Sequence, residues 1–196
     1  MGNPDTMIID PVLKYRVVAH TIPPVESEVI TIQPGEHTII PLITPQGRLK
    51  IILNTKKDYQ FIVRKAGENN TINVQNINKE QNYITGLYDI ELLTLPRQYF
   101  KDVRINQNQL TKLQLPSTGL ANVLLPGNGY GGVYLNDGDK LEEIYKFNGE
   151  SNQYKLTLLP GKYTVIYRAK SSKKYIYSNE KSFTIKSGKS QLIKIY

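Results

Sequence analysis

The residues best suited to hold a metal ion are two histidines and one short acidic turn. His20 and His37 are the only histidines of the 196-residue chain, and they lack the i, i+4 spacing that places two imidazoles on one helix face. Asn136-Asp137-Gly138-Asp139 gathers oxygen ligands. Asn-Asp-Gly also reverses a chain between two strands without any ion, and the longer acidic spacing of a calcium loop is missing. We therefore expect a simple turn here and no metal site.

Two glycine motifs match phosphate-binding loops in part. Gly127-Asn-Gly129-Tyr-Gly-Gly132 fits the dinucleotide-binding pattern, but a pyrophosphate needs a helix N-terminus after the glycines, and here the strand-like Val133-Tyr134-Leu135 follows. Gly188-Lys189-Ser190 copies the end of a P-loop, yet Phe183 stands where the first glycine is required. The sequence predicts no nucleotide site and no cofactor.

The side chains needed for catalysis do not pair along the sequence. The chain has no cysteine, which excludes a thiol nucleophile, a disulfide and a thiolate metal site. No serine or threonine has an evident base beside it. The neighbouring Glu142 and Glu143 point to opposite faces of a strand, so they cannot act on one substrate. We expect this protein not to be an enzyme.

The tyrosines are the remaining candidates for ligand binding. There are fourteen, and aromatic rings on an open sheet face can stack on sugars or on another protein. Tyr130 lies in the glycine-rich stretch, and Tyr134 and Tyr145 lie close after it. These three are the candidate ligand-binding residues. Tyrosine also favours half-buried strands, so most of the other rings are expected to belong to the fold.

The charge pattern excludes several partners. Lys and Arg outnumber Asp and Glu by 25 to 17, which gives a net charge of +8, but the positive charges are spread along the chain. The densest cluster, formed by Arg168, Lys170, Lys173 and Lys174, is interpreted as a solvated loop. No apolar run of 18 residues and no charged-then-apolar leader occurs. We expect neither a nucleic-acid partner nor a membrane span, and we interpret the chain as part of a larger exported protein.

Almost every segment alternates apolar and polar residues. Tyr59, Phe61 and Val63 alternate with polar residues such as Gln60 and Arg64, and no stretch sustains a helical period for three turns. Glycine- and asparagine-rich turns separate these segments at short intervals. The pattern predicts an all-β fold made of short strands.

A repeat organises the strands. Its tyrosine strand begins at Tyr15, Tyr88 and Tyr163, which are separated by 73 and 75 residues. Each copy continues into a hairpin pattern, and the three patterns are Ile30-Thr-Ile-Gln-Pro-Gly35, Val103-Arg-Ile-Asn-Gln-Asn108 and Phe183-Thr-Ile-Lys-Ser-Gly188. Gly or Asn ends each pattern, and these are the residues that best adopt a left-handed conformation.

The repeat predicts two complete β-sandwich domains. An opening pattern occurs only twice, at Gly47-Arg-Leu-Lys-Ile and at Gly119-Leu-Ala-Asn-Val. Residues 1–46 are therefore expected to hold a linker and the closing strands of an upstream unit, residues 47–118 one sandwich and residues 119–196 another, each with about seven strands. Leu115-Pro-Ser-Thr-Gly119 spells a sortase-type signal, but a whole domain follows it, so we interpret it as a linker.

The first closing strands lack the strands that open the other two units. Unpaired strands expose backbone donors and acceptors as well as apolar side chains. We expect this segment to be ordered only by packing on the next sandwich or on a second chain. Tyr15, Val17 and Ile30 are predicted to face that contact.

The Pro160-Gly-Lys-Tyr163 strand, the Phe183 hairpin and the Gly-x-Leu opening together resemble carboxypeptidase-regulatory-like, transthyretin-like repeats. More narrowly, the strings that begin at Tyr15 and Tyr88 and the Gly129-Tyr-Gly stretch resemble the region that follows the von Willebrand factor A domain in exported proteins of Bacteroidota. The resemblance implies tandem small antiparallel β-sandwiches of the transthyretin (prealbumin) type. The Asp-x-Ser-x-Ser metal motif of the von Willebrand factor A domain is absent, so its metal-dependent binding is not implied here.

The resemblance also implies a function class. It indicates a non-catalytic structural or protein-interaction module at the periplasm or cell surface, with a protein or a surface glycan as partner. The alternative is a carbohydrate-binding module that uses Tyr130, Tyr134 and Tyr145.

Overall fold

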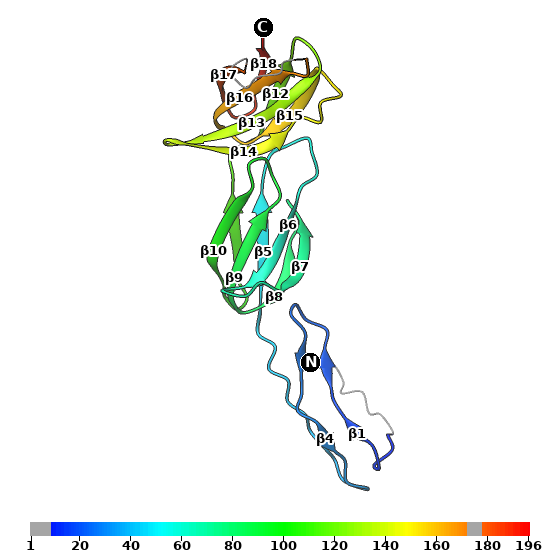
Figure 1. The fold of residues 1–196 in the computed structure, drawn as a ribbon. Coiled ribbons are helices and arrows are strands. Elements are labelled where there is room, and N and C mark those ends of the chain that lie inside the picture. The colour runs from blue at the N-terminus through cyan, green and yellow to red at the C-terminus, as the bar shows by residue number, and fades with distance from the viewer. Residues whose placement is uncertain (1–8, 172–177) are drawn as a thin grey trace.

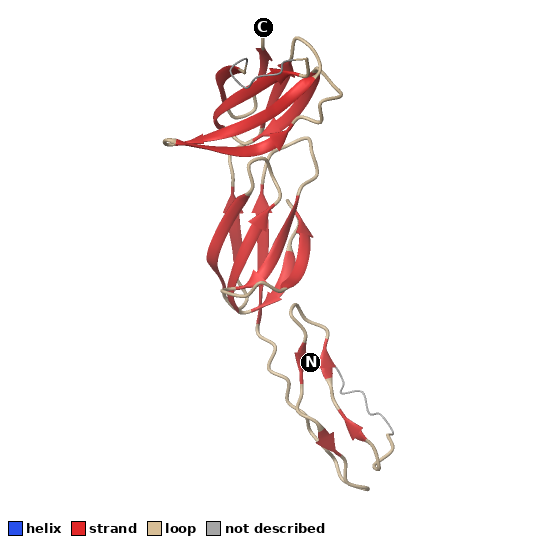
Figure 2. Ribbon diagram, viewed as in Figure 1, coloured by secondary structure: helices blue, strands red, loops and turns tan. Residues whose placement is uncertain are grey.

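The computed structural model describes residues 9–171 and 178–196, and every regular element among them is a β-strand (Figure 2). The all-β prediction is confirmed. Figure 1 shows three parts in a row, namely a long hairpin near the N-terminus, a first sandwich and a second sandwich. No helix within the described ranges is long and apolar enough to cross a membrane.

The first sandwich, called sandwich 1 below, consists of seven strands in two sheets. Its strands are β5 (Gln46–Ile52), β6 (Gln60–Lys65), β7 (Thr71–Asn76), β8 (Gln81–Ile84), β9 (Gly86–Leu92), β10 (Gln98–Ile105) and β11 (Leu110–Gln114). One sheet has the order β10-β9-β6-β7 and the other β11-β5-β8. Alternating side chains such as Phe61 and Val63 point into the core and are fully buried.

Sandwich 2 repeats this architecture. Its strands are β12 (Gly119–Leu124), β13 (Gly129–Asp137), β14 (Lys140–Lys146), β15 (Gln153–Leu158), β16 (Gly161–Ala169), β17 (Asn179–Ile185) and β18 (Ser190–Lys194). The sheet orders are β14-β13-β16-β17 and β15-β12-β18, which match those of sandwich 1 strand for strand. The prediction of tandem small sandwiches is thereby confirmed.

One pair of strands in each sandwich is parallel, and the other pairings are antiparallel as expected. β5 pairs in parallel with β11, and β12 pairs in parallel with β18. In both units the first and the last strand are these neighbours. The chain therefore returns to its starting sheet before it leaves the sandwich.

The repeated tyrosines occupy the same place in the two sandwiches. Tyr88 lies opposite Val103 in the β9–β10 pair, and Tyr163 lies opposite Phe183 in the β16–β17 pair. Each hydroxyl donates a 2.6 Å hydrogen bond to the carbonyl oxygen four residues earlier, in Ile84 and in Leu159. Thus the repeat seen in the sequence is a repeat of pairing and of hydrogen bonding.

The repeated Gly and Asn positions serve two different purposes. Asn108 and Gly188 adopt φ of 58° and 67°, so both turns use the left-handed conformation that the sequence predicted. Gly47 and Gly119 are required by close packing instead. A Cβ on Gly47 would lie 2.1 Å from the Asn106 carbonyl oxygen, and one on Gly119 would lie 2.6 Å from Ile185 Cγ2. A side chain at Gly47 would displace the turn between β10 and β11, and one at Gly119 would displace the turn between β17 and β18.

The N-terminal part is a two-stranded ladder that we call the hairpin (residues 14–31). Strands β1 (Lys14–Tyr15) and β4 (Ile30–Thr31) pair with each other, and β2 (Val18–Ala19) pairs with β3 (Val25–Glu26). None of residues 9–45 is buried. Among them, Ile22 makes the contact with the core of sandwich 1, whereas Val17, expected at that contact, is 37% exposed.

Candidate functional site: the joint between the two sandwiches

A short linker joins sandwich 1 to sandwich 2. It follows β11 and includes Ser117 and Thr118, as expected for the segment that resembles a sortase signal. The Thr118 amide donates to the Asn54 carbonyl (3.3 Å), and the Gly188 amide donates to the Thr118 carbonyl (3.2 Å). These two bonds tie the linker to both sandwiches, so it is not a free tether.

Two leucines pack across the joint in opposite directions. Leu159, between β15 and β16 of sandwich 2, is 5% exposed and belongs to the hydrophobic core of sandwich 1. Leu95, in the β9–β10 loop of sandwich 1, packs against the core of sandwich 2. The Leu159 amide donates a 2.8 Å hydrogen bond to the Leu95 carbonyl. Burial of one leucine is worth roughly 1.5–3 kcal/mol, so this exchange couples the two cores.

Two tyrosine hydroxyls hold the backbone at Leu159 and at Thr157, two residues earlier. Tyr59 of sandwich 1 is 4% exposed and donates to the Thr157 carbonyl of sandwich 2 (3.3 Å). Tyr163 is fully buried and donates to the Leu159 carbonyl (2.6 Å). Burial raises the pKa of both tyrosines above the ordinary value, so the hydroxyls stay neutral donors over the physiological range. Leu159 is thus held at its amide by the bond to Leu95 and at its carbonyl by the bond from Tyr163.

The same joint occurs once more, between the hairpin and sandwich 1. The Ile84 amide donates to the Ile22 carbonyl (2.7 Å) as the Leu159 amide donates to that of Leu95. A threonine hydroxyl closes each of the two loops that supply the accepting carbonyl. Thr21 donates to the Pro23 carbonyl (2.7 Å), and Thr94 donates to the Pro96 carbonyl (2.8 Å). The Thr-x-Pro loop of one unit thus docks on the next unit at the residue four before its tyrosine.

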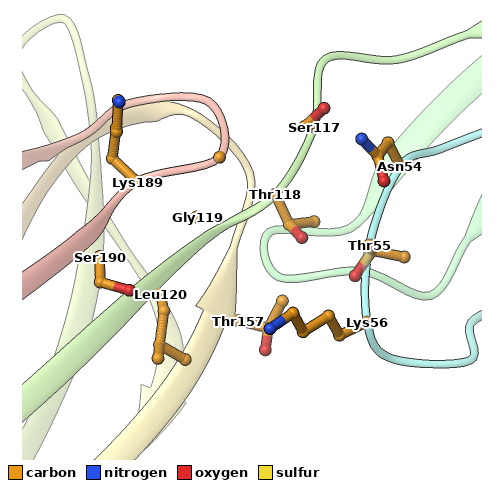
Figure 3. A pocket seen from close by; sticks show the side chains of 11 residues that line it. Asn54, Thr55, Lys56, Ser117, Thr118, Gly119, Leu120, Thr157, Lys189 and Ser190 are labelled. Carbon is orange, nitrogen blue, oxygen red and sulfur yellow. The ribbon is translucent and has the colours of Figure 1, made fainter.

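A pocket of about 300 Å³ lies at the joint (Figure 3). Residues of both sandwiches line it, including Asn54, Lys56, Thr118, Thr157 and Ser190. In Figure 3 the Lys56 side chain extends toward Thr157. Ammonium, amide and hydroxyl groups can bind an anion or a polyol. The lining contains no carboxylate, imidazole or thiol.

The structure does not bring the three candidate tyrosines together. Tyr130 is 47% exposed, with the Arg168 guanidinium carbon 5.7 Å from its ring centroid. Tyr134 is half-buried on β13 and donates to Glu143 (2.9 Å). Tyr145 lies opposite the buried Val133 and packs on the aromatic rings of the sandwich 2 core, so it is on the other face of the sheet.

The other sequence motifs take part in strand structure. Gly129, Gly131 and Gly132 lie within β13, where a Cβ on Gly131 would meet the Ile166 carbonyl oxygen at 2.0 Å. Asn136 and Asp137 end β13, and residues 138–139 form the turn to β14, with Gly138 at φ 58°. Over residues 9–171 and 178–196, no three His, Asp or Glu side chains gather in a group that could hold a metal ion. Lys173 and Lys174 lie outside the described residues.

The joint was not predicted from the sequence. Leu159 and Leu95 are ordinary apolar residues beside a proline, and no local pattern says which core each one enters. The available signal was the recurrence of Thr-Ile-Pro at residues 21–23 and Thr-Leu-Pro at residues 94–96, one repeat length apart.

No protein-family model and no curated protein sequence matches the chain. Among solved structures, the chain is similar to GBS52, the minor pilin of Streptococcus agalactiae, with 10% identity and a TM-score of 0.38 over 76% of this chain and 94% of the pilin chain. It is also similar to the Bacillus anthracis TIE protein, with 16% identity and a TM-score of 0.30 over 93% of this chain. The chain spans 40% of the length of that protein.

Proposed function

We propose that this chain is a non-catalytic structural module that holds neighbouring domains of an exported protein at a fixed separation and orientation. The observation that carries the proposal is the joint. Leu159 completes the core of the sandwich that precedes it, and Leu95 packs on the core of the sandwich that follows. A joint that shares core residues resists bending, because bending would expose apolar surface on both sides.

Repetition of the joint supports the same proposal. The bond from Ile84 to Ile22 reproduces the bond from Leu159 to Leu95, and it also joins a unit to its successor. A device that recurs at each boundary sets a constant relation between successive units. This is what a spacer in a tandem array requires.

The cellular setting is part of the proposal. The resemblance to the region that follows von Willebrand factor A domains in exported proteins of Bacteroidota supports a periplasmic or cell-surface location. It also supports a role in extending such a domain from the envelope or in helping it engage a protein partner. Sequencing the natural gene on both sides of this region tests the setting directly: a leader peptide and a von Willebrand factor A domain upstream are the expected result.

Distance measurements between the two sandwiches test the spacer role. The chain has no cysteine, so Glu68→Cys and Asp139→Cys introduce two unique spin-label sites, both on exposed turns. We expect a single narrow distance distribution from pulsed electron resonance. Leu159→Ser should broaden it, whereas Leu192→Ser, at a side chain that is 56% exposed on β18, should leave it narrow.

Two results would contradict the spacer role. One is a broad distribution in the unaltered joint. The other is a distribution unchanged by Leu159→Ser while circular dichroism shows both sandwiches folded.

Carbohydrate binding remains a second candidate function because of two observations. Tyr130 presents an exposed ring beside Arg168, and the pocket at the joint offers several hydroxyls and an ammonium group. A glycan array tests it, with Tyr130→Ala compared against Tyr99→Ala, whose ring is 65% exposed on sandwich 1. The candidate is discarded if no glycan binds, or if the two variants bind like the parent.

A further inference from the structure

The hairpin has the same strand register as the β9–β10 pair of sandwich 1. Tyr15 lies opposite Ile30 as Tyr88 lies opposite Val103. Farther along, Val18 lies opposite Glu26 as Glu91 lies opposite Tyr99. Every residue of these pairs is displaced by the same 73 positions, and Gly35 keeps the left-handed turn of Asn108. The hairpin is therefore a third copy of the closing strands.

The core-facing positions of this copy are apolar but uncovered. In sandwich 1 the inward side chains of β9 and β10 are at most 9% exposed, and they are Tyr88, Ile90, Leu92, Val103 and Ile105. The matching hairpin residues are Tyr15, Val17, Ala19, Ile30 and Ile32. None of these five is buried, and Val17 is 37% exposed. An apolar strand face of this kind is stable in water only when another layer covers it.

Sandwich 1 shows what covers such a face. There β6 runs antiparallel beside β9, with Val63 opposite Ile90, and β11 pairs in parallel with β5 of the facing sheet. Among the described strands, none pairs with the free edge of β1 and β2. The hairpin thus lacks the equivalents of β5 to β8. Its free edge and its apolar face are the ones that these strands cover in sandwich 1.

We infer that residues 14–40 are the closing part of a third sandwich, completed by four strands of the same polypeptide that precede Lys14. In both complete sandwiches the four opening strands come directly before the tyrosine strand, over Gln46–Ile84 and Gly119–Leu158. The missing first strand pairs in parallel with residues 37–40, and the missing second strand pairs antiparallel with residues 15–19. The inference rests on strand register, so it can fail or hold independently of the spacer role.

Hydrogen exchange tests the inference on two proteins, residues 1–196 and the natural polypeptide extended upstream by one further repeat. We expect amides of residues 15–19 and 30–32 to exchange at least about tenfold more slowly in the extended protein. Peptides from sandwich 2 should exchange equally in both and serve as the internal reference.

Two neighbouring valines provide matched variants in the extended protein. Val17 corresponds to Ile90, which faces the core, whereas Val18 corresponds to Glu91, which lies on the opposite face of the sheet and carries a carboxylate paired with arginines. The two are equally exposed in the described structure, at 37% and 38%. Val17→Asp should abolish the added protection of the hairpin, and Val18→Asp should retain it.

Three results would overturn the inference. The first is equal, strong protection of the hairpin in monomeric residues 1–196. The second is protection of that chain that rises with its concentration, since a second copy would then be the occupant. The third is an equal loss of protection in Val17→Asp and Val18→Asp.

Discussion

The two buried tyrosines allow one hydrogen bond to be deleted at two equivalent places with different consequences. Tyr88→Phe and Tyr163→Phe each remove a 2.6 Å bond to the carbonyl oxygen four residues earlier. A typical buried bond contributes about 0.5–1.5 kcal/mol, and about 1–3 kcal/mol where the acceptor is left unpaired. We expect each substitution to lower the unfolding free energy of its own sandwich by about 1–2 kcal/mol.

The two substitutions should differ because the two accepting residues, Ile84 and Leu159, make different contacts across their joints. Across its joint, Ile84 bonds to Ile22 of the exposed hairpin, whereas Leu159 fills the core of sandwich 1. Tyr163→Phe should therefore weaken both sandwiches, and Tyr88→Phe only sandwich 1. Hydrogen exchange of peptides from each sandwich in increasing urea separates the two responses.

A specific result would refute this reasoning. If Tyr163→Phe left the exchange of sandwich 1 peptides unchanged while sandwich 2 became less stable, Leu159 would not couple the two cores. Leu192→Ala, at an exposed position of β18, is the control for a general effect of substitution in sandwich 2.

Three further outcomes follow from the packing and the charges. Gly119→Ala should destabilise sandwich 2 by about 1–3 kcal/mol in urea, because its Cβ would lie 2.7 Å from two carbonyl oxygens, while Gly86→Ala, with its nearest contact at 3.7 Å, should be tolerated. Burial raises the pKa of Tyr88 to about 12, from 10.0, so the stabilisation from neutral Tyr88 is full below pH 10 and is lost as the pH rises toward 12. Tyr88→Phe should make the alkaline loss of stability of sandwich 1 shallower, and the remaining loss comes from Tyr83, whose pKa is also raised to about 12. Burial acts to raise the pKa of Glu91, but bonds from Arg64 and Arg97 outweigh it and the pKa falls; Glu91→Gln should cost roughly 1.5–3 kcal/mol near neutral pH, a difference from wild type that shrinks on acidification through the lowered pKa.

The strand repeat was predictable because it depends on local rules. Alternation marks the strands, and the exchange of Gly188 for Asn108 preserves a left-handed turn. The spacing of Tyr88 and Tyr163 then fixes which strands correspond. No rule of this kind shows that β5 and β11 pair in parallel, since that pairing joins residues about 60 positions apart.

The face on which Tyr145 lies has a particular physical cause. Counted from the turn at residues 138–139, a regular hairpin would place Tyr145 opposite Gly132, on the same face as Tyr134. The structure has a bulge between the pairs of Val133 and Tyr134, so Tyr145 lies opposite Val133 instead. One extra residue in a strand turns the following side chains to the other face, and nothing in the local sequence marks its position.

The parallel pairing of first and last strands gives each sandwich a mechanical direction. Because β5 and β11 run the same way side by side, the chain enters at one end of the unit and leaves at the other. Tension along the polypeptide therefore pulls these two strands in opposite senses and loads their hydrogen bonds in shear, so that many bonds share the force at once. Antiparallel first and last strands would instead be pulled apart from one end, one bond after another. The same arrangement recurs in β12 and β18, so a force applied at one terminus is carried through both units along the same kind of seam.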